Sequence, residues 1–472
     1  MSRAIRYRGA AVPVILGVAA FVFMRALATR TNYDEGVYLA SLEALRHGQR
    51  LGDDVYAAQP PAFYALLRAV AAPFGHSIEG IRVGFALIAV LGVGAALATG
   101  WRLFGYSAGL AAGALVVVAP PYPTVAPTVA ADVPSIALGI CALACAAFAT
   151  RPNPSRRWAA AAGAMLALAV LVKLLALPFI VPIVCLGLAA RCVRRLGPAF
   201  AAGAAAAAAL ILGAYASALP ELWRSVVGDH PQARGGEIAD NADRIAHLLD
   251  LHTPLAWLVA AGAIAAVTVP RARQTWPLWT LVPAVALFLV VRHPLLDHHL
   301  ALLSASCALA AGPSLALAIA SLRQSQRLLA SALLVVMLAA GAYQEQRRLH
   351  RNDLAEPAEI GWAAGVIARE TQPDDIVATD LPIISFLSRR APPGDLADTS
   401  STRIGSGALS QSQILRAIDD ARAPVTVVGR MFTSIAPLRV ELERRYPFRR
   451  PCGRLVLYFA RPPQQQLPPC PA

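Results

Sequence analysis

Eleven apolar runs, most of them close to the length of a bilayer-spanning helix, constrain this chain more than any other feature of its sequence. They cover residues 9–28, 81–100, 107–120, 133–149, 158–172, 174–190, 198–218, 254–269, 276–291, 299–319 and 327–343. A helix needs about 20 apolar residues to cross the hydrocarbon core, and fewer suffice where helices tilt or break. Only 15% of the 472 residues are charged, whereas a soluble domain averages about 25%. We therefore predict a polytopic α-helical membrane protein with about eleven transmembrane helices. The apolar piece 62–75 is too short to cross and is expected to lie in the interface or to re-enter.

Arginine-rich loops set the predicted orientation of these helices. Every second connection carries arginines and neither Asp nor Glu: MSRAIRYR, WRLFGYS, RPNPSRR, RCVRRLG, PRARQTW and SLRQSQR. Short basic loops stay on the cytoplasmic side, so the N-terminus is predicted inside and the C-terminus outside. Because the loops at both ends of 158–190 are basic, that stretch must cross an even number of times, and we predict a hairpin around Lys173. The same pattern explains the net charge of +14 and removes the case for a nucleic-acid partner.

The predicted domain organisation follows from a drop in hydropathy near residue 345. Residues 1–344 form the transmembrane domain, with outer loops at 29–80 and 219–253. Residues 345–462 alternate helix-like segments (PAEIGWAAGVIARE, SQSQILRAIDDARA and LRVELERRY) with strand-like ones (DDIVATD, PVTVVGR and GRLVLYFA). This alternation predicts a small extracytoplasmic α/β domain. Residues 463–472 are predicted to be a flexible tail.

Two covalent questions stay open at the sequence level. Cys452 and Cys470 could form a disulfide if the C-terminal domain lies outside the cytoplasm. The ALA at 26–28 imitates a signal-peptidase site. Since Arg25 interrupts that site, we expect the first helix to be retained, and cleavage would leave the topology of the rest unchanged.

An acidic pair, Asp34–Glu35, follows the first apolar run in the stretch TNYDEGVYLASLEALRHGQRLGDDVYAAQPPAFY. Such a pair could be an ordinary solvated helix end. However, the outer end of a helix that enters from the cytoplasm is its C-terminus, where the helix dipole disfavours anions. Tyr33 and Tyr38 flank the pair and can hydrogen-bond a polar ligand, and a carboxylate here can accept a proton from an incoming hydroxyl. Other polar residues of the loop are expected to cap and order it: Asp53, Asp54 and Gln59.

Asp132 and Lys173 are the ionisable residues that border apolar runs further along the chain. Asp132 opens the run 133–149 with a proline two residues on, so it could act as a helix cap alone, or as a cap that also contacts a ligand. Lys173 is the only lysine and lies between LALAVLV and LLALPFIVP. It could snorkel to the outer interface, but an ionisable group in apolar surroundings is a functional hypothesis. Its compact positive charge would suit a lipid-linked phosphate.

The densest polar cluster on a span boundary is RHPLLDHH, which contains Arg292, His293, Asp297, His298 and His299. It could be an interfacial cap, or it could hydrogen-bond a phosphate or sugar, or ligate a metal. Adjacent histidines on a helix point about 100° apart, which disfavours one shared metal. We therefore prefer phosphate or sugar contact. A weaker candidate group lies in the loop GDHPQAR and consists of His230 and Arg234.

Taken in order, these features resemble the GT-C glycosyltransferases, and most of all the protein O-mannosyltransferase (family 39) and aminoarabinose transferase branches. The shared features are an N-terminal span, DEGVY…QPPAFY in the first outer loop, an acidic residue in the second, a lysine after the fifth span and a histidine-bearing outer loop near the last spans. The resemblance covers about residues 1–345, and the C-terminal region differs from the accessory domains of the well-known members. It implies transfer of a sugar from a polyprenyl-phosphate carrier to an acceptor, most simply a hydroxyl, with inversion at the anomeric carbon.

The resemblance also implies roles for individual residues. Sugar transfer passes through an oxocarbenium-like transition state while negative charge grows on the leaving phosphate. Asp34 matches the catalytic carboxylate and Glu35 its neighbour, and Asp132 matches the second acidic position, which with Tyr38 would orient the acceptor or bind a metal. On physical grounds, and beside the resemblance, the donor phosphate needs nearby positive charges and hydrogen-bond donors, which Lys173, Arg292, His298 and His299 would supply.

A polytopic transporter of a small polar or lipid-linked solute is the alternative function. Transporters place polar residues near span centres and often repeat their halves, whereas here we find no internal repeat and the polar residues gather at the outer ends. We therefore predict a glycosyltransferase of the cell membrane whose active site and C-terminal domain face outward. Its partners would be the bilayer, a polyprenyl-phosphate-linked sugar, and an acceptor lipid, protein or polysaccharide. The sequence demands no cofactor and leaves a divalent metal open.

Overall fold

The computed structural model describes residues 3–25, 27, 29–150, 153–228, 238–248, 253–292, 294–352, 356–464 and 466–471. The ALA site at 26–28 therefore falls partly outside the described residues, and Asp229, His230, Arg234 and His293 fall outside entirely. The chain divides into two compact units. Unit 1 consists of Met1–Ala28, Glu79–Ala214 and Gly235–Asp353, and unit 2 consists of Thr29–Ile78, Tyr215–Arg234 and Leu354–Ala472.

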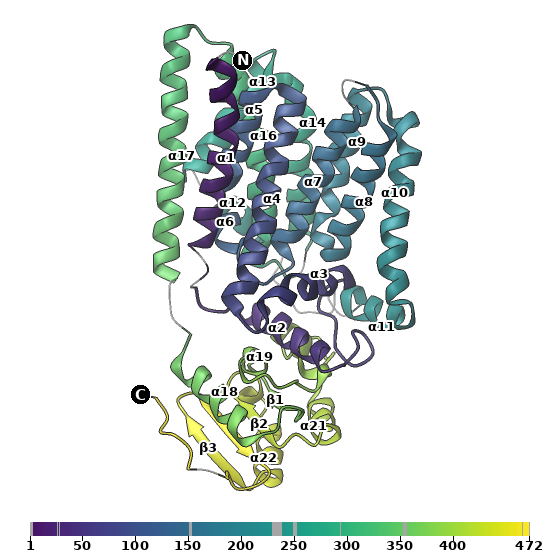
Figure 1. Cartoon of the computed structure of the whole chain (residues 1–472), viewed down its shortest axis with the longest axis vertical. Helices are drawn as coiled ribbons and strands as arrows, with labels where there is room; N and C mark the ends of the chain where they lie inside the picture. The colour runs from purple at the N-terminus through teal and green to yellow at the C-terminus, as the bar shows by residue number, and fades with distance from the viewer. Residues whose placement is uncertain are drawn as a thin grey trace. The chain divides into compact units, whose positions relative to one another are not determined.

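Unit 1 is helical, and every apolar run predicted from the sequence outside 62–75 forms helix in it (Figure 1). Its elements are α1 (Arg3–Met24), α4 (Ile78–Phe104), α5 (Tyr106–Val117), α6 (Tyr122–Val125), α7 (Asp132–Thr150), α8 (Arg156–Val172), η2 (Leu174–Phe179), α9 (Ile180–Ala189), α10 (Val193–Ala214), α12 (Ile238–Leu248), α13 (Pro254–Thr268), η6 (Ala272–Thr275), α14 (Trp276–Trp279), α15 (Leu281–Val290), η7 (Asp297–His299), α16 (Leu300–Ala320) and α17 (Gln324–Asn352).

Several of these helices are long and apolar enough to cross a bilayer. Among the described residues there are five: α4, α7, α10, the segment Asp297–Ala320, and Gln324–Arg347 of α17. A sixth is added if Pro254–Thr268 and Ala272–Val290, which are bent by 115° at their junction, count as one broken span. Shorter apolar helices account for most of the other predicted runs. The protein is thus polytopic, and the count of eleven crossings and their direction stay predictions.

The core of unit 1 is built from small side chains on closely packed helices. In the most apolar 18 residues of α7 and of Asp297–Ala320, 78% are buried, whereas in those of α10 and α17 only 11% are. Helices α7 and α16 are therefore central in unit 1, and α10 and α17 are peripheral. The helices α8 and α10 pack through Gly163 and Gly203: a Cβ at Gly163 would clash with the carbonyl of Phe200, and one at Gly203 with that of Ala160. Small residues allow such backbone contact in membranes.

Unit 2 combines the first predicted outer loop with the C-terminal region. Its elements are α2 (Tyr33–Arg46), α3 (Pro61–Ala71), η1 (Ala72–Phe74), η3 (Ala216–Ala218), α11 (Leu219–Trp223), η4 (Arg224–Gly228), α18 (Ala358–Glu370), β1 (Ala378–Thr379), α19 (Ile383–Ser388), η8 (Gly394–Leu396), α20 (Ser401–Gly405), α21 (Gln411–Asp420), β2 (Val425–Val428), η9 (Phe432–Ser434), α22 (Ala436–Arg445), β3 (Phe448–Cys452) and β4 (Leu455–Phe459). The predicted boundary near residue 345 lies close to the return of the chain from unit 1 to unit 2, but residues 29–78 belong to the second unit as well.

The sheet of unit 2 is small and mixed, in the order β1-β2-β4-β3. Strand β1 pairs parallel to β2, and β4 pairs antiparallel to both β2 and β3. All three predicted helices and all three predicted strands occur, although DDIVATD contributes only two paired residues. The sequence did not predict β3, because FRRPC carries two arginines and a proline. Proline is tolerated on an edge strand, which is where β3 lies.

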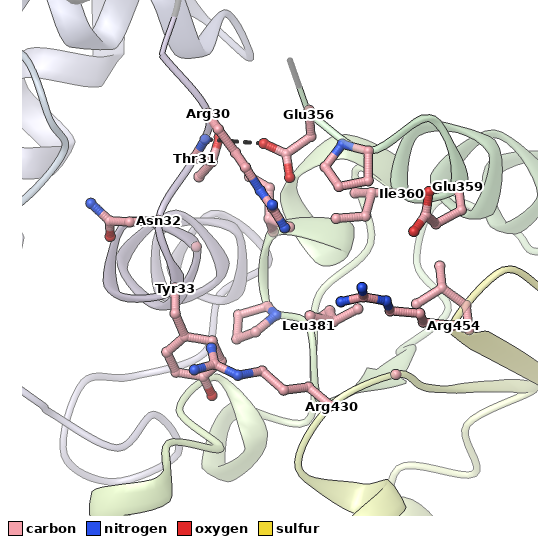
Figure 2. Close-up of a pocket in the computed structure, with 16 residues that line it drawn as sticks. Arg30, Thr31, Asn32, Tyr33, Glu356, Glu359, Ile360, Leu381, Arg430 and Arg454 are labelled. Carbon is pink, nitrogen blue, oxygen red and sulfur yellow. Dashed lines mark hydrogen bonds between the residues drawn. The ribbon is translucent and has the colours of Figure 1, made fainter. Parts of the chain in front are cut away.

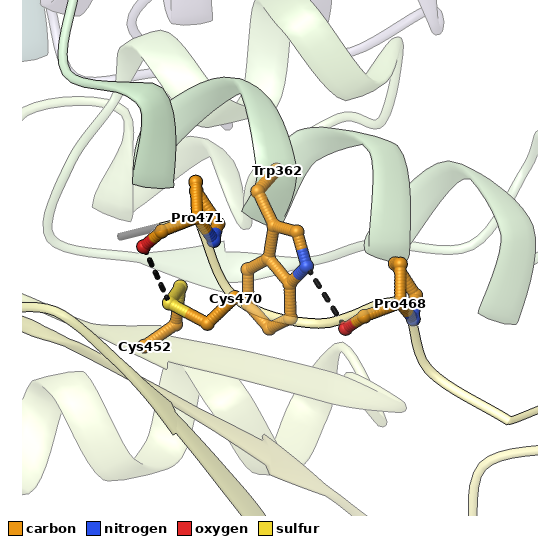
Figure 3. Close-up of a disulfide and its surroundings, with 5 residues drawn as sticks. All are labelled: Trp362, Cys452, Pro468, Cys470 and Pro471. Atoms are coloured by element: carbon orange, nitrogen blue, oxygen red, sulfur yellow. Dashed lines mark hydrogen bonds between the residues drawn. A yellow bond between two sulfur atoms is a disulfide. The ribbon is translucent and has the colours of Figure 1, made fainter.

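The C-terminal tail is anchored at its end (Figure 3). Cys452 at the end of β3 and Cys470 form a disulfide with a Cα–Cα distance of 5.4 Å. The indole N–H of Trp362 on α18 donates to the carbonyl of Pro468 at 3.2 Å. The segment predicted to be flexible is therefore tied to a helix and to a strand of the domain.

Candidate active site

Asp34 and Glu35 lie in the first turn of α2, directly after its N-cap Asn32. The Asn32 side chain accepts the backbone N–H of Glu35 at 2.8 Å, which ends the preceding extended segment and starts the helix. The sequence argument that the pair sits at a helix C-terminus is therefore wrong, because a new helix begins here. Its N-terminal dipole favours the two carboxylates. Asp34 is half-buried and Glu35 is fully buried.

Helix α2 is fixed in unit 2 by contacts close to the acidic pair. The hydroxyl of Tyr33 lies 2.9 Å from that of Thr399, so one donates to the other. A Cβ at Gly36 would lie only 3.1 Å from the backbone nitrogen of Ile383 in α19, so a glycine allows the two helices to approach. Tyr38, expected to orient an acceptor, is buried and accepts a hydrogen bond from Gln59 at 2.9 Å.

The other polar residues of the first loop do order it, as predicted. Asp54 Oδ2 accepts the backbone N–H of Arg50 at 2.8 Å, and the Asp53 carboxylate pairs with the Arg50 guanidinium at 3.1 Å. The amide of Gln59 is used by Tyr38. These residues shape the turn between α2 and α3, and Asp34 and Glu35 remain the candidates for chemistry in this loop.

Unit 1 contains a buried ion pair between Asp132 and Lys173. The Lys173 ammonium donates to Asp132 Oδ1 at 2.8 Å, and both residues are almost completely buried. The snorkelling interpretation of Lys173 is therefore wrong. The backbone of Lys173 is extended between α8 and η2, so the predicted break in the helix is present. Asp132 is the first residue of α7 rather than only its cap, and its carboxylate makes the long-range contact.

Arg292, His298 and His299 surround the same carboxylate. His298 Nε2 lies 3.9 Å from Asp132 Oδ2, and Arg292 is close enough to act on that carboxylate electrostatically. The two histidines lie in η7, the single turn that leads into α16, and their ring centroids are 4.4 Å apart. His299 is buried, and its Nδ1 accepts the backbone N–H of Leu296 at 3.1 Å.

The tautomer of His299 follows from that hydrogen bond. Because Nδ1 accepts, the neutral ring carries its proton on Nε2, which then acts as a donor. Lys173 adds an ammonium group to the same place. The cluster thus offers several N–H donors and positive charges around one carboxylate. This is an arrangement that binds an oxyanion.

A metal is the other ligand to consider here. Asp132, His298 and His299 each offer a ligand atom within 4.8 Å of the others, so the adjacent histidines do approach one point, contrary to the expectation for two α-helical neighbours. However, the Lys173 ammonium already occupies Asp132 Oδ1. A metal on His299 would require either a deprotonated Nε2 or loss of the bond from Leu296. The residues as arranged fit a phosphate better than a cation.

Two further residues, which no sequence pattern indicated, hold this cluster in place. The Asn241 side-chain amide donates to the carbonyls of Val290 and Arg292 at 3.0 and 2.7 Å. Arg244 pairs with Asp297 at 3.1 Å. Both lie on α12, a polar helix whose sequence gives no sign that it packs beside the histidines. The predicted candidates thus separate into Asp132, Lys173, Arg292, His298 and His299 in unit 1, and Asp34, Glu35 and Tyr38 in unit 2.

Comparison with known proteins finds one family model and several solved structures that are similar to this chain. Residues 58–215 match the family model described as dolichyl-phosphate-mannose-protein mannosyltransferase. No curated protein sequence matches the chain. ArnT from Cupriavidus metallidurans bound to undecaprenyl phosphate is similar with a TM-score of 0.70 and 17% identity, over 96% of this chain and 98% of that one. The apo form of the same ArnT is similar with a TM-score of 0.70 and 18% identity, over 97% of this chain and 98% of that one.

The chain is also similar in fold to an archaeal protein. The archaeal oligosaccharyltransferase AglB from Archaeoglobus fulgidus, in complex with an inhibitory peptide and a dolichol-phosphate, has a TM-score of 0.56 and 12% identity, over 90% of this chain and 70% of that one. The likeness to ArnT covers the C-terminal region too, so the expected departure from relatives' accessory domains does not hold for ArnT. The chain therefore has the fold of ArnT over nearly its whole length, and residues 58–215 match the protein mannosyltransferase family model.

Proposed function

We propose that this chain transfers one sugar from a polyprenyl-phosphate donor to an acceptor hydroxyl on the outer face of the membrane, with inversion. One observation carries the proposal: the buried pair Lys173–Asp132 with His298, His299 and Arg292 around it. Charged groups inside an apolar helical unit are costly and mark ligand sites. ArnT with undecaprenyl phosphate and AglB with a dolichol-phosphate add support from proteins of the same fold.

The cluster in unit 1 would hold the donor phosphate. As the bond between the anomeric carbon and the phosphate oxygen breaks, its electron pair stays on the phosphate. Lys173 and Arg292 would stabilise the charge that develops there, and the Nε2–H of His299 would donate to it. Asp132 would keep Lys173 protonated and in place. Because the lysine is held at 2.8 Å before the donor arrives, little reorganisation is needed.

Asp34 would act on the acceptor. The acceptor oxygen forms the new bond to the anomeric carbon from the face opposite the phosphate, and its proton passes to the Asp34 carboxylate. Glu35, buried in the same helical turn, would orient Asp34 or the acceptor. The acceptor is a lipid, a protein or a polysaccharide that carries the hydroxyl.

The outward orientation is supported by two independent features. Arginine-rich loops recur at every second connection, and a disulfide joins Cys452 to Cys470 in unit 2. Disulfides persist in oxidising compartments and are rare in the cytosol. Both features favour a plasma-membrane enzyme with unit 2 outside.

The test is sugar transfer by the purified full-length protein with a radiolabelled polyprenyl-phosphate sugar. Asp34→Asn should insert and fold normally yet lose about 10²- to 10⁴-fold in transfer rate, the usual contribution of a general base. Asp53→Asn, a carboxylate of the same loop that pairs with Arg50, is the matched control and should retain its rate. Wild-type transfer by Asp34→Asn would disprove the assignment.

A further inference from the structure

Unit 2 contains a cavity of about 440 Å³ beside the start of α2 (Figure 2). Its walls come from the segment that leads into α2, the start of α18, the residues that lead into α19, and the turns that follow β2 and β3. Three arginines line it, namely Arg30, Arg430 and Arg454. In Figure 2 the side chains of Arg30 and Arg454 point toward each other across the cavity. The transfer chemistry described above uses none of the three.

The three arginines make no ion pair with any residue that the structure describes. By the 4.0 Å limit for such a pair, no described carboxylate oxygen reaches any of the three guanidinium groups. Two glutamates also line the cavity, and one of them, Glu356, accepts the backbone N–H of Thr31 at 3.0 Å. Three cations thus face two carboxylates without pairing to them. A guanidinium in this state offers several N–H donors in a planar fork that matches carboxylate and phosphate oxygens.

Arg430 is held in place in a way that leaves its donors available. Its guanidinium lies over the ring of Tyr33, 4.2 Å from the centroid, and this cation–π contact uses no N–H. The loop beneath it is fixed by Asp380, a fully buried carboxylate that accepts the backbone N–H groups of Gly429, Arg430 and Phe432 at 2.7–2.8 Å. The position of the arginine is therefore set before any ligand binds.

The cavity lies next in the chain to the predicted base. Tyr33 lines it and carries Arg430, and Asp34 is the following residue on α2. Successive helical residues point about 100° apart, so the side chains of Tyr33 and Asp34 point to neighbouring regions and not to the same point. A molecule that spans both would place one polar group in the cavity and a second near Asp34.

We propose that the cavity is an acceptor subsite that binds an oxyanion, so that the acceptor is an anionic saccharide. Its phosphate or carboxylate would be bound by Arg30, Arg430 and Arg454, and the hydroxyl that receives the sugar would be a separate group of the same molecule. The role of the cavity as an acceptor subsite rests on the proposed function. The binding of an anion rests on the cavity alone.

Binding can be measured without any transfer. Isothermal titration of the purified full-length protein with glucose 6-phosphate, glucuronate and glucose distinguishes phosphate, carboxylate and neutral ligands. Either or both anions should bind and glucose should not. The double variant Arg430→Gln/Arg454→Gln should bind the anion about tenfold more weakly or worse, because two charge-assisted contacts are lost. Glu356→Gln, which removes a negative charge from the wall, should tighten binding.

Two control variants make the result decisive. Arg461→Gln changes an exposed arginine of unit 2 outside the cavity and should bind like wild type. His299→Gln alters the buried cluster of unit 1 and should also leave anion binding unchanged. If the anion is lost in His299→Gln and kept in the double variant, it binds the donor site and the inference is overturned.

The proposal and the transfer reaction can fail separately. With an anionic acceptor, the double variant should raise the KM for the acceptor and leave kcat unchanged, whereas Asp34→Asn should lower kcat and leave anion binding intact. Equal anion binding by wild type and the double variant would overturn the proposed subsite and leave the proposed role of Asp34 unaffected. Anion binding with no effect of the double variant on acceptor KM would overturn the acceptor role.

Discussion

The ammonium of Lys173 lies 2.8 Å from Oδ1 of Asp132, and only 4% and 1% of the two side chains are exposed. Each charge is therefore stabilised mainly by the other, while His298 and Arg292 also lie near the Asp132 carboxylate. Breaking a buried pair by removing one partner is far more damaging than removing both, because the remaining charge has no solvent to stabilise it.

This pair predicts a strong coupling in stability. Lys173→Met should lower the free energy of unfolding by about 3–5 kcal/mol, and the double variant Asp132→Asn/Lys173→Met should be much less unstable than the sum of the single changes. The measurement is thermal unfolding of the detergent-purified protein, with Arg461→Gln as a neutral control. Simple additivity would show that the two groups do not interact.

The hydrogen bond from Leu296 to His299 Nδ1 predicts that transfer does not need a metal. Treatment with a chelator followed by gel filtration should change the transfer rate by less than about twofold, whereas loss of a required metal would abolish activity. His299→Gln retains a terminal amide donor near the position of Nε2 and should keep more activity than His299→Ala. Activity lost on chelation and restored by a divalent ion would place a metal on Asp132 and the histidines instead.

The disulfide between Cys452 and Cys470 should stabilise unit 2. It closes a loop of 18 residues in sequence separation, and chain-entropy arguments assign about 3 kcal/mol to a loop of this size. Cys452→Ser/Cys470→Ser should therefore unfold at lower denaturant concentration, and wild type treated with a reductant should match it. Alkylation of the unreduced, unfolded protein should modify five cysteines. Modification of all seven would contradict both the disulfide and the oxidising location.

Tyr33 should make the stability of unit 2 sensitive to alkaline pH. Burial raises the pKa of its phenol well above the ordinary value, and the nearby Asp398 carboxylate raises this pKa further. The stability that the neutral phenol contributes is fully present below its pKa in the unfolded chain, about 10. It is lost as the pH rises above that value, because only the unfolded chain then releases the proton. Tyr33→Phe should show a shallower loss of unfolding free energy between about pH 9.5 and 11. An unchanged slope would show that this phenol is not protected.

The helices of unit 1 were predictable because apolar runs recur along the chain and arginine-rich loops separate every second pair of them. The strand β3 was not, since Arg449, Arg450 and Pro451 have low strand propensity and are tolerated only because the strand is at an edge. The start of α2 was also missed. Asn32 is a good N-cap, but the sequence was interpreted with Asp34 at the C-terminus of the preceding helix, so no new helix was predicted there.

The types of residue predicted which side chains belong to the candidate site, but their spacing in the sequence did not predict which of them are in contact. Lys173 and Asp132 were selected separately, 41 positions apart, and their direct contact depends on how α7 packs against η2. Asn241 and Arg430 were not selected at all, because an amide on a polar helix and an arginine after a strand are common. What distinguishes them is the set of carbonyls and rings that they meet in the folded chain, and those come from distant segments.

The sheet of unit 2 has a consequence for the order in which its parts can assemble. Strand β4 is an inner strand of the sheet and pairs with both β2 and β3, so the sheet cannot close before β4 has been synthesised. Helix α2 packs against α19, which follows it by more than 300 residues. During translation, α2 therefore cannot pack against α19 until all the helices of the intervening segments have been made.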